Sequence, residues 1–237
     1  MINMEIQRRL ILLGGGSLAE KTTLAIDAKV AEYAKKHAGD KRAVGVFIGT
    51  ASHDSMPYFN SFRKTYTGEF NIKADCVLSV YGEMNADKIK SKFAKADMLY
   101  IGGGDTLYML DHWKKTGVFD LVIDAYNRGV IICGLSAGAI CWFDKMYTDS
   151  DSFADGGKYH ICDGLKILPG LCCPHYEERK NDFSYAAKDY TGLIWALEGN
   201  AAIVFENEKY IGAYSSSGNA YKIEHTSYGQ RMSILTK

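Results

Sequence analysis

Short apolar runs alternate with longer amphipathic stretches over the first two thirds of the chain. Such apolar runs are typical of β-strands buried in a parallel sheet, and the amphipathic stretches are typical of the helices that connect them. The predicted strands are RLILLGG (9–15), AVGVFIGT (43–50), IKADCVLSV (72–80), DMLYIGG (97–103) and VIICG (130–134). The predicted helices cover 18–39, 58–70, 85–96, 106–117 and 118–129. The pattern predicts an α/β fold with its ligand site at the carboxyl edge of the sheet.

The rhythm changes in the last third. YTDSDSFADGGKYH (147–160) is polar and glycine-containing, which predicts a loop that borders the site. LKILPGLCCPH (165–175) predicts a further strand, and the short β-rich runs over 192–225 predict antiparallel strands that finish the sheet. The chain has no internal repeat and no low-complexity linker, so we expect a single domain over residues 1–237.

A serine lies between two glycines directly after the fifth predicted strand. The segment Gly134-Leu135-Ser136-Ala137-Gly138 fits the pattern G-x-S-x-G. In serine hydrolases this pattern forms a sharp strand-to-helix turn that exposes the serine hydroxyl. A simple tight bend would also use two glycines, so the assignment depends on partner residues elsewhere. Ser136 is the candidate nucleophile.

Two other glycine clusters follow predicted strands. GGGS (14–17) lacks the complete G-x-G-x-x-G pattern and its matching acid, so we interpret it as a strand-to-helix turn and not as a dinucleotide site. GGGDT (102–106) holds more glycines than a turn needs. Because glycine N–H groups can approach a developing oxyanion closely, we predict that the N–H groups of Gly103 and Ala137 form an oxyanion hole.

A serine nucleophile requires a histidine within hydrogen-bond reach and an acid that orients this histidine. His175 ends a predicted strand, where a site at the carboxyl edge of the sheet lies, and it is the predicted base. The local sequence leaves the acid open. The candidates are Glu198, Asp151, Asp163, Glu177 and Glu178.

A cluster of histidines and cysteines between residues 160 and 175 raises a metal alternative. The cluster has no paired C-x2-C, and adjacent cysteines of an extended strand point to opposite faces. The six cysteines also lack the dense spacing of a disulfide scaffold. We therefore predict no metal and no cofactor, with reduced and mostly buried thiols. The residues of this cluster are His160, Cys162, Cys172, Cys173 and His175.

Basic and acidic residues balance, with 28 of each and a formal net charge of zero. Such a chain lacks the long-range field that attracts nucleic acid or an anionic membrane. The apolar stretch near the N-terminus is too short for a signal peptide or a membrane span. We predict a cytoplasmic enzyme with a small peptide substrate, no nucleic-acid or membrane partner, and a homodimer as a candidate assembly.

Four motifs occur in a fixed order: GGGDTLYML, GLSAGAICW, CPHYEER and LEGNAA. In these motifs, and over residues 9–215, the chain resembles the dipeptidase E and cyanophycinase family of serine peptidases. The resemblance implies a three-layer α/β/α fold with a mostly parallel sheet, similar to class I glutamine amidotransferases and flavodoxin-like. It also implies a Ser-His-Glu triad of Ser136, His175 and Glu198, with Asp151 as the alternative acid.

The dipeptidase branch of that family releases an N-terminal aspartate, which implies an arginine beyond the catalytic histidine that holds the substrate carboxylate. Arg179 matches this position, and a guanidinium fork fits a carboxylate. Asp105 of GGGDT, where aspartyl dipeptidases tend to carry asparagine, is the second predicted substrate-binding residue. The implied reaction is hydrolysis of short peptides through an acyl-enzyme, by a dipeptidase or related exopeptidase that accepts an acidic N-terminal residue.

Two alternatives remain at this point. An α/β-hydrolase esterase would use His225 with an intervening acid such as Asp189, in the chain order serine, acid, histidine. A catalytically silent, amidotransferase-like binding domain would keep the G-x-S-x-G turn as a bend. In such a domain, Ser136, His175 and Glu198 would have no reason to converge.

Overall fold

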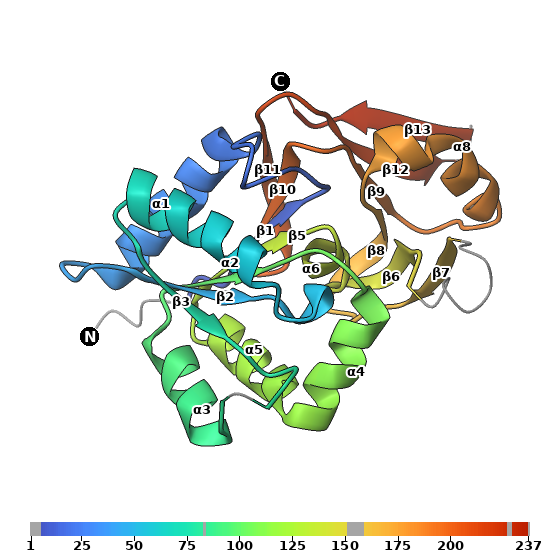
Figure 1. The fold of residues 1–237 in the computed structure, drawn as a ribbon. Coiled ribbons are helices and arrows are strands. Elements are labelled where there is room, and N and C mark those ends of the chain that lie inside the picture. Colours follow the sequence, from blue (N-terminus) through green and yellow to red (C-terminus); the bar gives the residue numbers. More distant parts are fainter. Residues whose placement is uncertain (1–5, 83, 151–158, 227–228, 237) are drawn as a thin grey trace.

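A seven-stranded sheet forms the centre of the structure, a computed structural model that describes residues 6–82, 84–150, 159–226 and 229–236 (Figure 1). The strand order is β11-β10-β1-β5-β4-β2-β3. The five strands from β1 to β3 in this order are parallel, and β10 and β11 extend the sheet antiparallel to β1. All five strands predicted in the first two thirds are confirmed. The strands are β1 (Arg9–Leu13), β2 (Val44–Ile48), β3 (Lys73–Val77), β4 (Met98–Ile101), β5 (Ile131–Leu135), β10 (Ala201–Glu206) and β11 (Lys209–Ser215).

Helices cover both faces of this sheet (Figure 1). One face packs against α1 (Leu24–Ala38) and α2 (Met56–Arg63), which continues into a π-helix at Lys64–Glu69. The opposite face packs against α3 (Ala86–Lys95), α4 (Thr106–Thr116) and α5 (Val118–Asn127). A 3₁₀ turn (Thr50–Ser52) and the short helix α6 (Ala137–Ile140) lie in the loops after β2 and β5. No helix among the described residues is long and apolar enough to cross a bilayer.

A second sheet of six strands follows in the order β13-β12-β9-β8-β6-β7. Its three middle strands are parallel, and β7, β12 and β13 pair antiparallel at its margins. The helix α8 (Tyr176–Ala186) covers one face. The strands are β6 (Phe143–Thr148), β7 (His160–Asp163), β8 (Leu168–Cys173), β9 (Ile194–Leu197), β12 (Ala220–Thr226) and β13 (Gly229–Ile234).

The second sheet corrects two sequence-based expectations. The sequence predicts that the C-terminal strands finish a single sheet, but only β10 and β11 join the first sheet. The sequence predicts a loop over 147–160; β6 extends into its start as far as Thr148 and β7 begins at its last residue, His160, while residues 151–158 lie outside the described residues. β6 pairs with β7 and with β8, and β7 pairs with β6 alone, so the pairing of both strands depends on segments outside their own local pattern. The likeness to class I glutamine amidotransferases stays a prediction.

The two sheets share one apolar core. Phe205 of the first sheet packs edge-on against Trp195 of the second, with ring centroids 5.2 Å apart, and against Phe143 at 6.0 Å. All three side chains are buried. Aromatic pairs of this kind add directional packing to the burial of a large apolar area. The contact joins the two sheets near the amino ends of β1, β6 and β9.

A buried carboxyl group lies beneath the first sheet, on α1. Asp27 is fully buried, and its two oxygens accept hydrogen bonds from Thr23 Oγ1 at 2.7 Å and Tyr66 OH at 2.8 Å. Burial disfavours the charged form and raises the pKa of Asp27. The two hydrogen bonds lower this pKa, but burial has the larger effect, and the pKa is raised to about 6. The folded state therefore binds a proton at Asp27 more tightly than the unfolded chain does.

We expect Asp27→Asn to remove a pH dependence of stability. Because the pKa of Asp27 rises from 3.8 to about 6 on folding, its contribution is complete below pH 4 and is lost as the pH rises through 6. The wild type should lose about 2–3 kcal/mol of unfolding free energy over this window relative to Asp27→Asn. Urea denaturation at several pH values measures the difference. Asp40→Asn, at an exposed position, is the control; equal pH profiles for the wild type and Asp27→Asn would contradict the assignment.

Candidate active site

Ser136 lies in a tight turn between β5 and α6. Its backbone has φ 50° and ψ −111°, a conformation that costs energy for any residue other than glycine. The flanking glycines are required, because a Cβ at Gly134 would overlap the carbonyl of Gly138, and a Cβ at Gly138 would overlap that of Ile101. The N–H of Ser136 donates to the carbonyl of Leu13 at 3.0 Å. The turn holds the hydroxyl at the carboxyl edge of the first sheet, as the sequence predicts.

His175 follows β8 and faces Ser136. Its Nε2 is 3.0 Å from Ser136 Oγ. The residue has a left-handed backbone, with φ 49°, and its N–H donates to the carbonyl of Gly14 at 3.0 Å. The imidazole lies against Gly15, where an added Cβ would be 2.5 Å from its Cε1. The structure thus brings the predicted nucleophile and the predicted base into hydrogen-bond contact, 39 positions apart in the chain.

The surroundings of His175 favour its neutral form. Burial lowers the pKa of the imidazole, and the nearby Arg179 guanidinium lowers it further. The carboxylates of Glu178, Glu177 and Asp149 act in the opposite direction, but the net shift is downward from 6.5. A neutral imidazole can accept the proton of a serine hydroxyl, so this environment suits a general base near neutral pH.

Glu198 follows β9, next to the strand that leads to His175. Its Oε2 accepts the N–H of Asn219 at 2.8 Å, and its Oε1 accepts the hydroxyl of Tyr221 at 2.9 Å. No hydrogen bond joins this carboxylate to His175 within the described residues. The backbone of Glu198 contacts Gly14, the residue whose carbonyl accepts the His175 N–H. Glu198 is therefore connected to the base through the residue 14–15 turn.

The other candidate acids have separate environments. Asp163, on β7, forms ion pairs with two lysines. Glu177 accepts the backbone N–H of Gly199 at 2.8 Å, and Glu178 is exposed on α8. Asp151 lies outside the described residues. Among the described acids, none forms a hydrogen bond with the imidazole of His175.

Two backbone segments border the Ser136 side chain. A Cβ at Gly103 would be 3.2 Å from Ser136 Cβ, so only glycine leaves this approach free. The Gly103 N–H donates a long hydrogen bond of 3.5 Å to Tyr58 OH. Ala137 is the first residue of α6, where a helix leaves backbone N–H groups without an internal acceptor. The predicted oxyanion residues thus lie beside Ser136, and Tyr58 is a neighbour of Gly103 that the sequence did not indicate.

A cavity of about 360 Å³ opens in front of Ser136 and His175. Arg179 stacks on the Tyr159 ring at 4.4 Å, and its buried Nε has no hydrogen-bond partner among the described residues. Asp105 caps α4 by accepting the N–H of Tyr108 at 2.9 Å, a structural role that the substrate prediction did not include. The lining residues are Gly104, Asp105, Ser136, Asp149, Ser150, His175 and Arg179.

Two residues of this cavity were missed by the sequence analysis. Asp149 is exposed at the end of β6, and Ser150 is buried beside it. Ser150 Oγ accepts the N–H groups of Thr106 at 2.8 Å and Leu107 at 3.2 Å, the first residues of α4. The polar segment TDSDS could have indicated that Asp149 and Ser150 lie near the site, but its contact with the GGGDT loop depends on the second sheet.

The structure separates the residues of the alternative sites. His225 is exposed on β12, with its ring near Gln230 Nε2 at 3.4 Å, and Asp189 is exposed after α8. The esterase alternative requires His225 beside Ser136, but the histidine that Ser136 faces is His175. Cys172 and Cys173 are fully buried. In the described ranges, no three His, Cys, Asp or Glu side chains are grouped so as to hold a metal ion.

The sequence and fold match known peptidases. The family model of "Peptidase family S51" matches residues 10–212. The chain belongs to peptidase family S51. Its relatives include "Uncharacterized peptidase YgaJ" of Bacillus subtilis, 29% identical over 221 residues and 90% of each chain, and "Peptidase E" of Haemophilus influenzae, 24% identical over 63% of this chain and 71% of the relative.

Solved structures of similar fold agree with this family. A peptidase from an acI-B1 Actinobacterium superposes with a TM-score of 0.72 at 14% identity, over 96% of this chain and 94% of that one. A candidate peptidase E of Listeria monocytogenes EGD-e superposes at 0.65 with 19% identity, over 88% and 98%. The resemblance to peptidase E is confirmed, and this S51 member is a serine peptidase and not a silent binding domain.

We expect Gly15→Ala to displace the imidazole of His175. The new Cβ would lie 2.5 Å from Cε1 and 2.7 Å from Nδ1 of His175, so the ring must move away from Ser136. A displacement of this size should lower kcat roughly 100-fold, measured with a peptide substrate. Gly212→Ala is the matched control, because its Cβ meets nothing within 4 Å. Equal activity of the two variants would show that Gly15 does not position the base.

Proposed function

We propose that this peptidase hydrolyses short peptides, as a dipeptidase or related exopeptidase, through an acyl-enzyme on Ser136. The observation that carries the proposal is the 3.0 Å contact between Ser136 Oγ and His175 Nε2 at the wall of a small cavity. Acyl transfer requires an exposed nucleophile, a neutral base and backbone donors for the oxyanion. The strained serine turn, the neutral histidine and the glycine-lined backbone beside them supply these parts. A fold alone would not support this substrate class.

In the proposed reaction, His175 Nε2 takes the proton of Ser136 Oγ while the oxygen attacks the scissile carbonyl carbon. The N–H groups of Gly103 and Ala137 donate to the resulting oxyanion; for Gly103 this replaces the long bond to Tyr58. The intermediate then collapses, the amine leaves with the proton from His175, and the acyl group stays on Ser136. Water, deprotonated by His175, hydrolyses the ester and restores the serine.

Glu198 is the proposed acid of a Ser-His-Glu triad. Because its carboxylate bonds to Asn219 and Tyr221, we assign it a positioning role. These bonds fix the chain after β9, which packs against the residue 14–15 turn that holds the His175 N–H and supports its ring. Asp151 stays the alternative acid.

The charges of the cavity support a short peptide with free ends. The Arg179 guanidinium lines this cavity and can pair with a substrate carboxylate. Asp149, across the same cavity, can pair with the ammonium group of a free N-terminus. A volume of about 360 Å³ is near the lower end of small-molecule sites, which favours a dipeptide over a folded chain.

The acidic N-terminal residue is proposed on the basis of Arg179, and Asp105 is kept as a second wall of the same cavity. The absence of a cofactor, a cytoplasmic location, a homodimer and a single domain over 1–237 stay predictions.

A screen of free dipeptides against their N-acetylated forms tests the proposal. We expect hydrolysis of free dipeptides, with those that begin with an acidic residue included, and little hydrolysis of acetylated ones, because acetylation removes the charge that pairs with Asp149. Ser136→Ala should lower kcat by at least about 10³-fold and abolish labelling by a fluorophosphonate probe.

The control for this screen is His225→Ala, at an exposed histidine outside the cavity. It should retain wild-type activity, whereas His175→Ala should lose it. Undiminished labelling of Ser136→Ala would overturn the assignment of the nucleophile. Equal hydrolysis of free and acetylated dipeptides would overturn the exopeptidase assignment and leave the nucleophile in place.

We expect the acid limb of the pH profile to report His175. Since only the neutral imidazole accepts the serine proton, kcat/KM should rise with pH and reach half its maximum below pH 6.5, where the lowered pKa lies. Arg179→Gln removes a nearby cation that lowers this pKa, so the midpoint should move to higher pH. Lys180→Gln, at an exposed neighbouring cation, should leave the midpoint unchanged. If the pH midpoint of kcat/KM is the same in Arg179→Gln and the wild type, Arg179 does not influence the group that titrates.

A further inference from the structure

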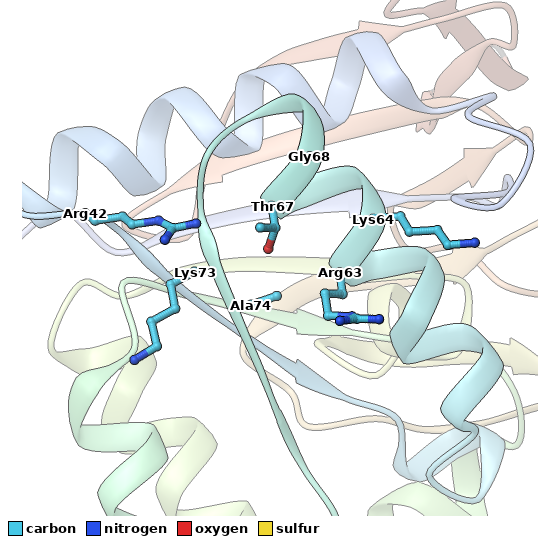
Figure 2. A pocket seen from close by; sticks show the side chains of 7 residues that line it. All are labelled: Arg42, Arg63, Lys64, Thr67, Gly68, Lys73 and Ala74. Carbon is cyan, nitrogen blue, oxygen red and sulfur yellow. The ribbon is translucent and has the colours of Figure 1, made fainter.

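A second cavity, of about 550 Å³, lies at the edge strand β3, away from the catalytic residues (Figure 2). Arg42 and Lys73 stand at the amino ends of β2 and β3, whereas Ser136 follows the carboxyl end of β5. Because these strands are parallel, one cavity lies at the amino ends of the strands of the first sheet and the other lies at their carboxyl ends. The lining residues are Arg42, Arg63, Lys64, Thr67, Gly68, Lys73 and Ala74.

Four of these seven residues are cationic, and none of the four has a carboxylate within ion-pair distance among the described residues. Two of the acids that flank the cavity in sequence form ion pairs with lysines outside it, whereas Asp40, two residues before Arg42, is exposed. Glu69 pairs with Lys21, and Asp75 pairs with Lys92. In a chain with a formal net charge of zero, this surface, which we call the cationic cavity, keeps an uncompensated positive charge.

Two guanidinium groups of the cationic cavity are held in place. Arg42 Nε donates to the carbonyl of Asn71 at 3.2 Å, and Arg63 Nη2 donates to Asn60 Oδ1 at 3.3 Å. Each group keeps further N–H donors for a ligand. Figure 2 shows Arg42 and Arg63 on opposite sides of Thr67. A guanidinium fork matches two oxygens of one phosphate, so two forks on opposite sides match a ligand with more than one phosphate.

The wall between these arginines is a π-helix, Lys64–Glu69, that continues directly from α2. Turns of this kind are rare and occur frequently at functional sites, because the extra residue widens the turn and redirects side chains. Here it places Lys64, Thr67 and Gly68 on the cavity wall. A Cβ at Gly68 would meet nothing within 4 Å, so the space beside it is open.

We infer that the cationic cavity binds an oligophosphate, either pyrophosphate or the phosphate chain of a nucleotide. Its four cations are exposed, so a singly charged anion would gain little against water and salt. A ligand with several adjacent negative charges gains from more than one of these cations. The volume accommodates a small ligand of this kind. This site is independent of the peptidase reaction.

Titration calorimetry of the full chain with pyrophosphate tests the inference. We expect saturable binding that weakens as salt is added, because exposed charges are screened. Arg42→Gln/Arg63→Gln should weaken binding by about tenfold or more, since two charge-assisted contacts are lost. Lys35→Gln/Lys90→Gln removes the same charge from exposed positions on α1 and α3 and should bind as the wild type does.

Three outcomes would overturn the inference. The first is that neither pyrophosphate nor ATP binds. The second is that both double variants weaken binding equally. The third is that Arg179→Gln abolishes binding, which would place the ligand in the catalytic cavity. Comparable binding of pyrophosphate and ATP would assign recognition to the phosphates, and tighter binding of ATP would assign the nucleotide as the source. Unchanged melting temperatures of the variants without ligand show that they are folded.

Discussion

The end of β1 holds the active site together through backbone hydrogen bonds. The carbonyl of Leu13 accepts the N–H of Ser136, and the carbonyl of Gly14 accepts the N–H of His175. The carbonyl of Gly15 accepts the N–H of Asn200, two residues after Glu198. Three successive carbonyls therefore fix the segments that carry the proposed nucleophile, the proposed base and the proposed acid. This arrangement requires glycine at 14 and 15, where any side chain would overlap the backbone after β9 or the imidazole.

The chemistry lies where two sheets meet. Ser136 follows a strand of the first sheet, while His175 and Glu198 follow adjacent parallel strands of the second. The first sheet alone would carry a strained serine with no base. The aromatic contacts of Phe205 with Trp195 and Phe143 join the sheets. The precision of the Ser136–His175 contact thus depends on a core that touches neither residue.

Charge is distributed unevenly in a chain whose total is zero. The catalytic cavity carries both signs, with Arg179 and Asp149 on its walls, which suits a zwitterionic substrate. The cationic cavity at the opposite edge is lined by charges of one sign, and two neighbouring acids, Glu69 and Asp75, pair with lysines outside it. Pairing, and not composition, decides which surfaces can attract an anion.

Local sequence patterns were enough to predict the alternating strands and helices of the first sheet, the Ser136 turn and the candidate base His175. Each of these is a local property: periodicity specifies a buried strand, and two glycines around a serine specify a tight bend. Tertiary structure decided the rest. β6 is a strand because β8 and β7 pair with it, and β7 is a strand because β6 pairs with it. Asp149 reaches the cavity because β6 ends there, and the Glu198 carboxylate bonds to Asn219 and Tyr221 because β12 lies beside β9. Such contacts join residues far apart in the chain, so no local pattern encodes them.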